Sequence, residues 1–257
     1  MKAKNVLITG STSGIGLTIA TVFAEAGYNL VFHGLEKDGA EIAAEIGKQN
    51  RINTFFSSAN LLDSAEIAAM VKEANFHLGD IDILVNNAGI QFVSPVEDFP
   101  INKWNDIIAV NLTAAFCTSQ AVWKGMKVKN WGRIINISSA HGLVASENKS
   151  AYVASKHGLI GLTKTLALEG AGCGITANAI CPGFVKTPLV EKQITDLANQ
   201  HNISQADVTQ NNILQKHAIK NFVRSEEIAA LAIFLSSENA SMITGVAMPV
   251  DGGWVAQ

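Results

Sequence analysis

The sequence predicts an α/β protein with a doubly wound parallel sheet, and three observations support this fold class. Short apolar runs of strand length alternate with helix-length segments along nearly the whole chain. A glycine-rich turn joins the first apolar run to the first helical segment. No linker composition and no internal repeat divides the sequence, so we expect a single domain over residues 1–257.

The expected elements follow one another as strand–helix units. Apolar runs predict strands at residues 4–9, 29–33, 52–56, 83–85, 133–137, 175–180 and 246–250. Helices are expected from the glycine turn to residue 26 and at 37–49, 64–77, 102–127, 150–171 and 225–235. Because parallel strands need crossover connections, this alternation places helices on both faces of the sheet.

Composition and charge narrow the class of protein. The chain is 48% hydrophobic and 16% charged, which is typical of a compact protein with a buried core. A formal net charge of −3 gives no basic surface, so we expect no nucleic acid partner. No apolar run approaches the roughly 18 residues that span a bilayer, and no signal peptide precedes the first strand. We therefore expect a cytoplasmic protein with no membrane partner. The three cysteines lack metal-ligand spacing, and we predict no metal site.

The glycine-rich turn reads GSTSGIG over residues 10–16. Gly10, Gly14 and Gly16 let the backbone approach a pyrophosphate, and the amino end of the next helix offers free N–H groups and a positive dipole. Strand, glycine turn, helix and second strand together form the setting of a Rossmann-type dinucleotide site. An ordinary glycine turn is the alternative, because the spacing is G-x-x-x-G-x-G rather than G-x-G-x-x-G.

A second candidate site lies between the fifth strand and the helix that follows it. Tyr152 and Lys156 are four residues apart, which puts both side chains on one face of that helix. A lysine ammonium beside a phenol favours the phenolate, so we expect Lys156 to lower the pKa of Tyr152. Ser139 follows the fifth strand, at the carboxyl edge where open α/β sheets bind ligands. Taken alone, the Tyr–Lys spacing also fits an exposed pair of side chains.

One segment interrupts the alternation of strands and helices. Residues 189–220 are rich in Gln and Asn and follow Pro182-Gly183 at the carboxyl end of a strand. We interpret residues 188–220 as a helical substrate flap whose closure would exclude water from the cleft. A polar surface excursion is the alternative.

With these motifs in hand, the chain resembles the short-chain dehydrogenase/reductase family over nearly its whole length. Six motifs stand in the family's order, namely TGSTSGIG (9–16), NNAG (86–89), Asn111, ISS (137–139), Tyr152-x-x-x-Lys156 and PGFVKT (182–187). The resemblance implies reversible hydride transfer between a nicotinamide cofactor and an alcohol/carbonyl pair. It also implies a homotetramer, with one interface formed by the helices that begin at Asn102 and Ser150.

The resemblance assigns catalytic roles to four residues. Tyr152 would exchange the proton of the substrate oxygen, and Lys156 would lower its pKa and hold the nicotinamide ribose. Ser139 would hydrogen-bond the substrate oxygen, and Asn111 would hold a water that continues a proton relay from Lys156. These roles agree with the chemistry, because hydride transfer at a carbonyl needs a proton exchanged at its oxygen.

The cofactor residues that the resemblance implies come from the glycine turn and from the carboxyl ends of later strands. They are Gly10, Thr12, Ser13, Gly14, Ile15, Gly16, Leu35, Asn60, Leu61, Asn87, Ala88, Gly89, Tyr152, Lys156, Pro182, Gly183, Val185 and Thr187.

NAD is expected as the cofactor rather than NADP. Gly34, Leu35 and Ser13 stand where users of NADP usually place Arg or Lys, and Glu36 would repel a 2′-phosphate. Lys37 is the residue that could reverse this preference. The chain departs from the family in having Gly34 where many NAD users have Asp. It also has Asn60 in place of Asp, although an amide oxygen can accept the same hydrogen bond.

Within the family, the likeness is closest to the bacterial enzymes that oxidise D-3-hydroxybutyrate. It rests on SSAHGLVAS (138–146), Lys149, PGFVKTPLVEKQI (182–194) and the ending DGGWVAQ. The substrate residues that this likeness implies are Gln91, Ser139, His141, Lys149, Tyr152, Gln193 and Trp254. The glutamines, the histidine and Lys149 would hold the carboxylate of a small hydroxy or keto acid, because such an anion needs a cation and several donors. Trp254 would lie near the substrate methyl group or the cleft mouth.

Other interpretations of these residues and of the chain stay open at this point. Lys149 could be an exposed lysine before a helix, His141 a structural histidine, and Trp254 part of a subunit interface. A reductase of 3-oxoacyl thioesters would have the same fold and catalytic residues, but would use NADPH and need no carboxylate site. A non-catalytic NAD-binding protein would not need the proton relay.

Overall fold

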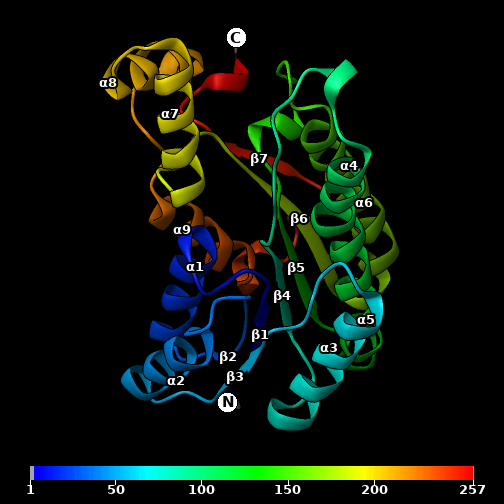
Figure 1. Cartoon of the computed structure of the whole chain (residues 1–257). Coiled ribbons are helices and arrows are strands. Elements are labelled where there is room, and N and C mark those ends of the chain that lie inside the picture. The colour runs from blue at the N-terminus through cyan, green and yellow to red at the C-terminus, as the bar shows by residue number, and fades with distance from the viewer. Residues whose placement is uncertain (1–2, 257) are drawn as a thin grey trace.

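The computed structural model describes residues 3–256, apart from the side chains at positions 188, 189, 193, 200 and 201. A seven-stranded parallel sheet runs in the order β3-β2-β1-β4-β5-β6-β7 (Figure 1). The strands are β1 (Asn5–Ile8), β2 (Asn29–His33), β3 (Thr54–Ser57), β4 (Ile83–Asn86), β5 (Gly132–Ile137), β6 (Ile175–Pro182) and β7 (Ala247–Val250). The chain winds outward from β1 to β3 and then returns to β4 beside β1. This order confirms the predicted doubly wound sheet.

Helices cover both faces of the sheet. They are α1 (Gly14–Glu25), α2 (Gly39–Asn50), α3 (Ser64–Leu78), α4 (Ile101–Ile108), α5 (Ala114–Lys129), α6 (Ser150–Gly170), α7 (Pro188–His201), α8 (Gln205–Val208) and α9 (Ser225–Leu235). One core cluster joins the sheet to α1 and α9, and a second joins it to α3, α5 and α6 (Figure 1). Because both faces are covered, β1, β2, β4, β5 and β6 are buried along their whole length, whereas the edge strands β3 and β7 are only partly buried.

The expected helix over residues 102–127 is interrupted in the structure. A π-helical turn, Ala109–Thr113, separates α4 from α5. The apolar positions run through the turn without a break in period, so the sequence pattern could not reveal it. Such turns insert one extra residue and frequently occur at functional sites. Here the turn carries Asn111, whose side chain is buried.

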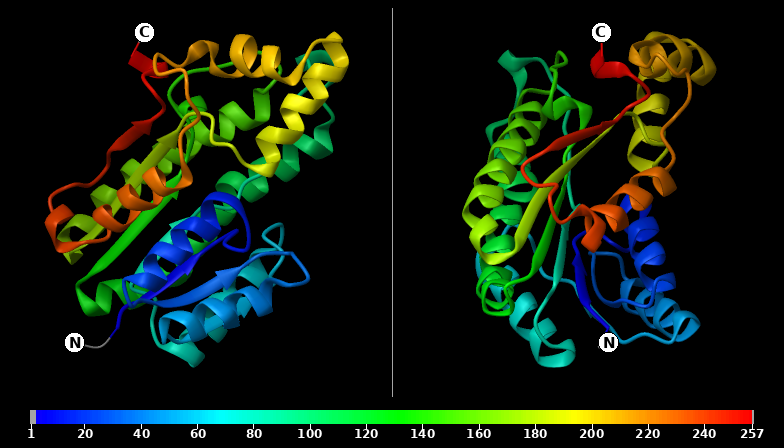
Figure 2. Two further views of the ribbon diagram at one scale, coloured as in Figure 1. Left: turned by 90° about the vertical axis from the view of Figure 1, so that its left-hand side faces the viewer. Right: turned by 180° about the vertical axis from the view of Figure 1, so that it is seen from behind.

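The segment between β6 and α9 folds as helices, as predicted for residues 188–220. Thr187 caps α7 by accepting a hydrogen bond from the N–H of Val190, and Asn202 ends the helix in the left-handed conformation. The segment has a small core of its own, formed by Ile194, Ala198, Val208, Ile213 and Leu214. Two further views show α7 and α8 above the carboxyl edge of the sheet (Figure 2). Lys216 and His217, later in the same segment, lie against Trp254 near the C-terminus. Within residues 3–256, no helix has the length and apolar character needed to cross a membrane.

Candidate active site

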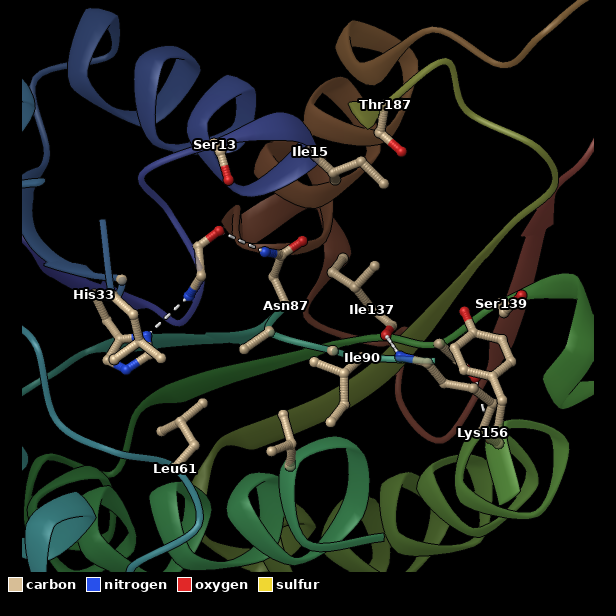
Figure 3. A pocket seen from close by; sticks show the side chains of 18 of the residues that line it. Ser13, Ile15, His33, Leu61, Asn87, Ile90, Ile137, Ser139, Lys156 and Thr187 are labelled. Carbon is tan, nitrogen blue, oxygen red and sulfur yellow. Dashed lines mark hydrogen bonds between the residues drawn. The ribbon is translucent and has the colours of Figure 1, made fainter. Parts of the chain in front are cut away.

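A cavity of about 730 Å³ opens at the carboxyl edge of the sheet (Figure 3). Residues after β1, β2, β3, β4, β5 and β6 line it, together with side chains from α4, α6 and α7. It spans the point where the chain reverses its direction of winding, between β1 and β4. Open α/β sheets bind their ligands at such a point.

The glycine turn fits a dinucleotide pyrophosphate. Gly10 has a φ of +64°, and a Cβ atom there would lie 3.1 Å from the Cα of Ala88. A Cβ atom at Gly16 would collide with the carbonyl of Gly10. The Asn87 amide donates to the carbonyls of Thr9 and Gly10, both at 2.9 Å, and so holds the turn against β4. The first turn of α1 carries no acidic side chain, so its N–H groups and dipole can favour an anion.

Most of the predicted cofactor residues line the cavity. They are Gly10, Ser13, Ile15, Leu35, Asn60, Leu61, Asn87, Ala88, Gly89, Tyr152, Lys156, Pro182, Gly183, Val185 and Thr187. Thr12, Gly14 and Gly16 belong to the same turn but are not part of the cavity wall. The Thr12 side chain is buried and turns towards Glu36, and Gly16 packs behind Gly10.

Glu36 occupies the position above the glycine turn. Its carboxylate accepts hydrogen bonds from the hydroxyl of Thr12 and, at 3.1 Å, from the hydroxyl of Ser13. The bond from Thr12 is the main reason that the pKa of Glu36 lies below its usual value. A Cβ atom at Gly34 would collide with the Thr12 side chain, which explains why no Asp stands there. The Asn60 side-chain oxygen accepts from the N–H of Leu62, which leaves one lone pair for another donor.

Ser139, Tyr152 and Lys156 all line the cavity. Figure 3 shows Ser139 and Lys156 on the same side of it. Lys156 projects from α6, and its Nζ donates to the carbonyl of Ile137 at 2.8 Å. The same Nζ lies 5.7 Å from the centre of the Tyr152 ring. Ser139 follows β5 and accepts a hydrogen bond from the N–H of His141 at 3.1 Å. The geometry therefore groups a hydroxyl, a phenol and an ammonium around one region of space, as acid–base catalysis at a carbonyl oxygen requires.

Without a cofactor, Lys156 does not lower the pKa of Tyr152 as expected. Burial raises the pKa of Tyr152 above its ordinary value, and a hydrogen bond with Ser139 offsets only part of this effect. Burial also lowers the pKa of Lys156 to about 8. The cost of burying a charged phenolate at Tyr152 thus outweighs the attraction of the Lys156 ammonium, which already donates a hydrogen bond to the Ile137 carbonyl.

Asn111 lies behind the cavity wall rather than on it. Its side-chain oxygen accepts from the N–H of Ile90 at 2.8 Å, and its Nδ2 donates to the carbonyl of Ile90 at 2.9 Å. Nδ2 also donates to the hydroxyl of Ser155 at 3.1 Å. Asn111 thus joins the π-turn, the residues after β4 and α6, and it fixes the backbone beside Gly89.

Three of the predicted substrate residues cluster next to the cavity but do not line it. His141, Lys149 and Trp254 are all buried. The His141 ring lies 4.9 Å from the Trp254 ring and 5.9 Å from the Tyr152 ring, measured between centroids. Phe184 stacks on Trp254 at 5.3 Å, and the Nζ of Lys149 lies 5.7 Å from the Phe184 ring. These groups form a buried cluster of aromatic and basic side chains beside Tyr152.

The electrostatics of this cluster favour an anion. Lys149 is 7% exposed and has no ion pair among the described residues. Burial, with a contribution from Lys216, lowers its pKa to about 8. Burial and the two lysines lower the pKa of His141 to about 3, so the imidazole is neutral at neutral pH. A buried ammonium without a carboxylate partner is costly, and a bound carboxylate would offset that cost.

The structure describes the side chain of only one of the two glutamines predicted to bind the substrate. Gln91 is half-buried beyond the NNAG turn and does not line the cavity. The side chain of Gln193 lies outside the described residues, so its predicted contact with the substrate stays a prediction.

The sequence reasoning missed several residues of the site. His217 is fully buried, accepts from the N–H of Phe184 at 3.2 Å, and lies 5.9 Å from the Trp254 ring. Lys216 donates to the hydroxyl of Ser146 at 3.1 Å, and Ser146 lies 2.8 Å from the Nε2 of His141. The segment between β6 and α9 thereby contributes Lys216 and His217 from a distant part of the chain. Their spacing in the sequence carries no motif that could have revealed them.

No group of three or more His, Cys, Asp or Glu side chains in the described part of the chain is arranged to hold a metal ion. The site thus combines the glycine turn, the Ser139–Tyr152–Lys156 group on the cavity wall, and a buried cluster of basic and aromatic side chains beside it. The sequence model of the family described as short chain dehydrogenase matches residues 4–198. The chain belongs to the short-chain dehydrogenase family, whose members use a nicotinamide cofactor.

Two curated relatives resemble the chain over nearly its full length. The D-beta-hydroxybutyrate dehydrogenase of Cupriavidus necator is 49% identical, with 100% of both chains covered. The D-beta-hydroxybutyrate dehydrogenase of Rhizobium meliloti is 48% identical, with 99% of both covered. A 3-oxoacyl-[acyl-carrier-protein] reductase of Staphylococcus epidermidis is 37% identical over 97% of this chain and 98% of its own.

A solved structure agrees with the fold. A crystal structure assigned to the short-chain alcohol dehydrogenases, from Sinorhizobium meliloti, superposes with a TM-score of 0.88 at 34% identity. It covers 100% of this chain and 98% of the other. The likeness thus includes the helical segment between β6 and α9.

Proposed function

We propose that the protein catalyses the reversible, NAD-dependent oxidation of D-3-hydroxybutyrate to acetoacetate. One observation carries this proposal. The buried Lys149 ammonium has no ion pair among the described residues and lies in the cluster with His141, Phe184 and Trp254. The His141 ring of this cluster is 5.9 Å from the Tyr152 ring, and Tyr152 lines the cavity. A short hydroxy acid could place its carboxylate at the ammonium and its hydroxyl at the phenol. The similarity to two D-beta-hydroxybutyrate dehydrogenases supports the same substrate.

In this mechanism the protein binds and orients the substrate and moves one proton. Ser139 and Tyr152 hold the hydroxyl on C3, and Tyr152 takes its proton as the carbonyl forms. Lys156 would hold the nicotinamide ribose and add its positive charge near the phenolate once the cofactor is bound, and Asn111 would hold a water that connects Lys156 to a proton relay. A bound nicotinamide supplies the hydride acceptor. In the reverse direction, the phenol returns the proton to the oxygen of acetoacetate.

The preference for NAD rests on Glu36. Its carboxylate is held above the glycine turn by Thr12 and Ser13, and its lowered pKa keeps it charged at neutral pH. A negative charge at this place would repel the 2′-phosphate of NADP, while the ribose hydroxyls of NAD could donate to it. Lys37 is the nearest residue in sequence that could weaken the preference.

The proposal includes a closing flap and an oligomer in the cytoplasm. Residues 188–220 would close over the substrate and bring Gln193 to its carboxylate. A homotetramer is supported by apolar side chains on the two long helices of one face, because Phe116 on α5 is 47% exposed and Leu168 on α6 is 82% exposed.

The carboxylate site is tested by Lys149→Met, which keeps the length of the side chain and removes its charge. We expect the KM for 3-hydroxybutyrate to rise by about 10- to 100-fold, because a charge-assisted contact is lost. Steady-state NADH formation measures this effect. Lys48→Met, on the exposed side of α2, is the matched control and should leave KM unchanged. If an uncharged secondary alcohol loses as much activity with Lys149→Met, the proposed carboxylate role is wrong.

A further inference from the structure

His33 ends β2 beneath the glycine turn and has no part in the mechanism above. Its side chain is 3% exposed. The backbone N–H of Gly10 donates to His33 Nδ1 at 3.0 Å, and His33 Nε2 lies 2.9 Å from the carbonyl oxygen of Ala59. The N–H of Ser11 donates to the His33 carbonyl at 2.7 Å, and the His33 N–H donates to the Ser11 hydroxyl at 3.0 Å. One residue therefore joins the glycine turn, β2 and the loop after β3.

The two partners of the imidazole determine where its proton lies. A backbone N–H can only donate, so Nδ1 must present its lone pair to Gly10. A carbonyl oxygen can only accept, so Nε2 must carry the proton that is donated to Ala59. The ring is therefore neutral and in a single tautomer. Burial lowers the pKa of His33, against opposing effects of the Ala59 carbonyl and the Glu36 carboxylate, which agrees with a neutral ring.

Gly10 is held from two sides by this arrangement. Its carbonyl accepts from the Asn87 amide at 2.9 Å, and its N–H is held by His33 (Figure 3). Its φ of +64° places the peptide in the left-handed region, close against Ala88. The backbone that faces the cavity at this turn thus depends on both side chains.

We propose that His33 is a positioning residue for cofactor binding, because its neutral imidazole holds the Gly10 peptide in the conformation that cradles the pyrophosphate. Protonation of the ring would turn Nδ1 into a second donor facing the Gly10 N–H, and cofactor affinity would fall. Glu36, after β2, is the charged group that acts on the ring. The other groups that face it, at Gly10, Ala59 and Ser57 on β3, are uncharged. This inference rests on the proposed dinucleotide-dependent function.

Two substitutions separate the two contacts of the ring. In His33→Asn, the side-chain oxygen takes the place of Nδ1 and can accept from Gly10, but it does not titrate. In His33→Gln, the terminal NH₂ can still donate to Ala59, but no acceptor reaches Gly10. We expect His33→Asn to bind NADH within about threefold of the wild type at neutral pH. We expect His33→Gln to bind about tenfold more weakly, because a buried N–H has lost its acceptor.

Titration of NADH fluorescence measures these affinities at neutral pH and, because burial lowers the pKa of His33, down to pH values well below the ordinary pKa of histidine. The wild type should bind NADH more weakly once the ring is protonated, whereas His33→Asn should not show this loss. Nitrogen-15 spectra of the imidazole should show Nε2 protonated and Nδ1 unprotonated at neutral pH. If His33→Gln does not fold, as judged by its thermal unfolding, the pH series of the wild type against His33→Asn decides the matter.

Equal affinity of His33→Gln and the wild type, or a proton on Nδ1, would overturn the positioning role. An equal loss of affinity with acid in His33→Asn would overturn the proton linkage. If the wild type binds NADPH rather than NADH, the NAD proposal fails, and the same comparison made with NADPH still decides the role of His33. If it binds neither dinucleotide, both proposals fail.

Discussion

Tyr152 needs more than the neighbouring lysine to act as a base near neutral pH. Burial raises its pKa, and the hydrogen bond with Ser139 only partly compensates. The Nζ of Lys156 donates to the Ile137 carbonyl and has a pKa of about 8. The oxidised nicotinamide ring carries a positive charge that would favour the phenolate of Tyr152. The protein itself does not supply this charge. We therefore infer that proton transfer becomes favourable only after the cofactor is bound.

This inference gives a prediction for the phenol itself. The chain has two tyrosines, so Tyr28→Phe leaves Tyr152 as the only phenol. In that variant, we expect the pKa of Tyr152 to lie above its ordinary value and to fall when NAD is added. Ultraviolet difference spectra of the phenolate over the alkaline pH range measure both values, with Tyr28→Phe/Tyr152→Phe as the blank. A phenolate present at neutral pH without NAD would show that Lys156 alone suffices.

For Tyr152 and Lys156, the sequence predicted the position of the side chains better than their ionisation. The Tyr152–Lys156 spacing correctly placed both side chains at the cavity because a helix holds them one turn apart. The pKa of Tyr152 depends on burial by residues from several elements, and no spacing encodes it. The tautomer of His33 likewise depends on Gly10 and Ala59, which lie 23 and 26 residues away.

At the scale of elements, the segment between β6 and α9 is held against the loop after β5. Lys216 closes the short helical turn Leu214–Lys216, donates to the Ser146 hydroxyl at 3.1 Å, and lies 5.4 Å from the Trp254 ring. Ser146 in turn lies 2.8 Å from the Nε2 of His141. The position of this segment is thereby coupled to His141, a residue of the proposed carboxylate site.

We predict that Lys216→Met loosens the flap and weakens substrate binding. Amide hydrogen exchange in residues 205–216 should become faster. The KM for 3-hydroxybutyrate should rise several-fold, because the lost hydrogen bond contributes about 1 kcal/mol. Exchange followed by mass spectrometry measures the first effect, and steady-state kinetics the second. Lys192→Met, on the exposed side of α7, is the control for charge and should leave exchange in this segment unchanged. Unchanged exchange in Lys216→Met would show that the contact with Ser146 does not hold the flap.

The elements themselves were largely predictable, and the exceptions have physical causes. Strand β3 begins at Thr54 rather than residue 52, because Arg51 adopts the left-handed conformation that ends α2. The π-turn around Asn111 was not foreseen, because its buried bonds to Ile90 and Ser155 come from distant segments. Apolar periodicity identifies a helix well but does not report one inserted residue.

At the scale of the whole molecule, the parallel sheet gathers the site at one edge. The glycine turn follows β1, Ser139 follows β5, and the helical segment with α7 and α8 follows β6. Strand order brings these segments together although they are far apart in sequence. The position of the glycine turn and of Ser139 directly after strands predicted this edge as the site, and the cavity opens there. The sequence could not predict that His141, Lys149 and Trp254 would be buried beside the cavity rather than on its wall.

The central claim is that this fold oxidises one enantiomer of a short hydroxy acid with NAD. The most direct measurement is the rate of NADH formation by the purified protein with NAD and each enantiomer of 3-hydroxybutyrate, repeated with NADP. We predict rapid NADH formation with the D enantiomer and NAD, and little with the L enantiomer or with NADP. Activity only with NADPH and acetoacetyl thioesters would retain the Tyr152 mechanism and contradict both the substrate and the cofactor proposed here.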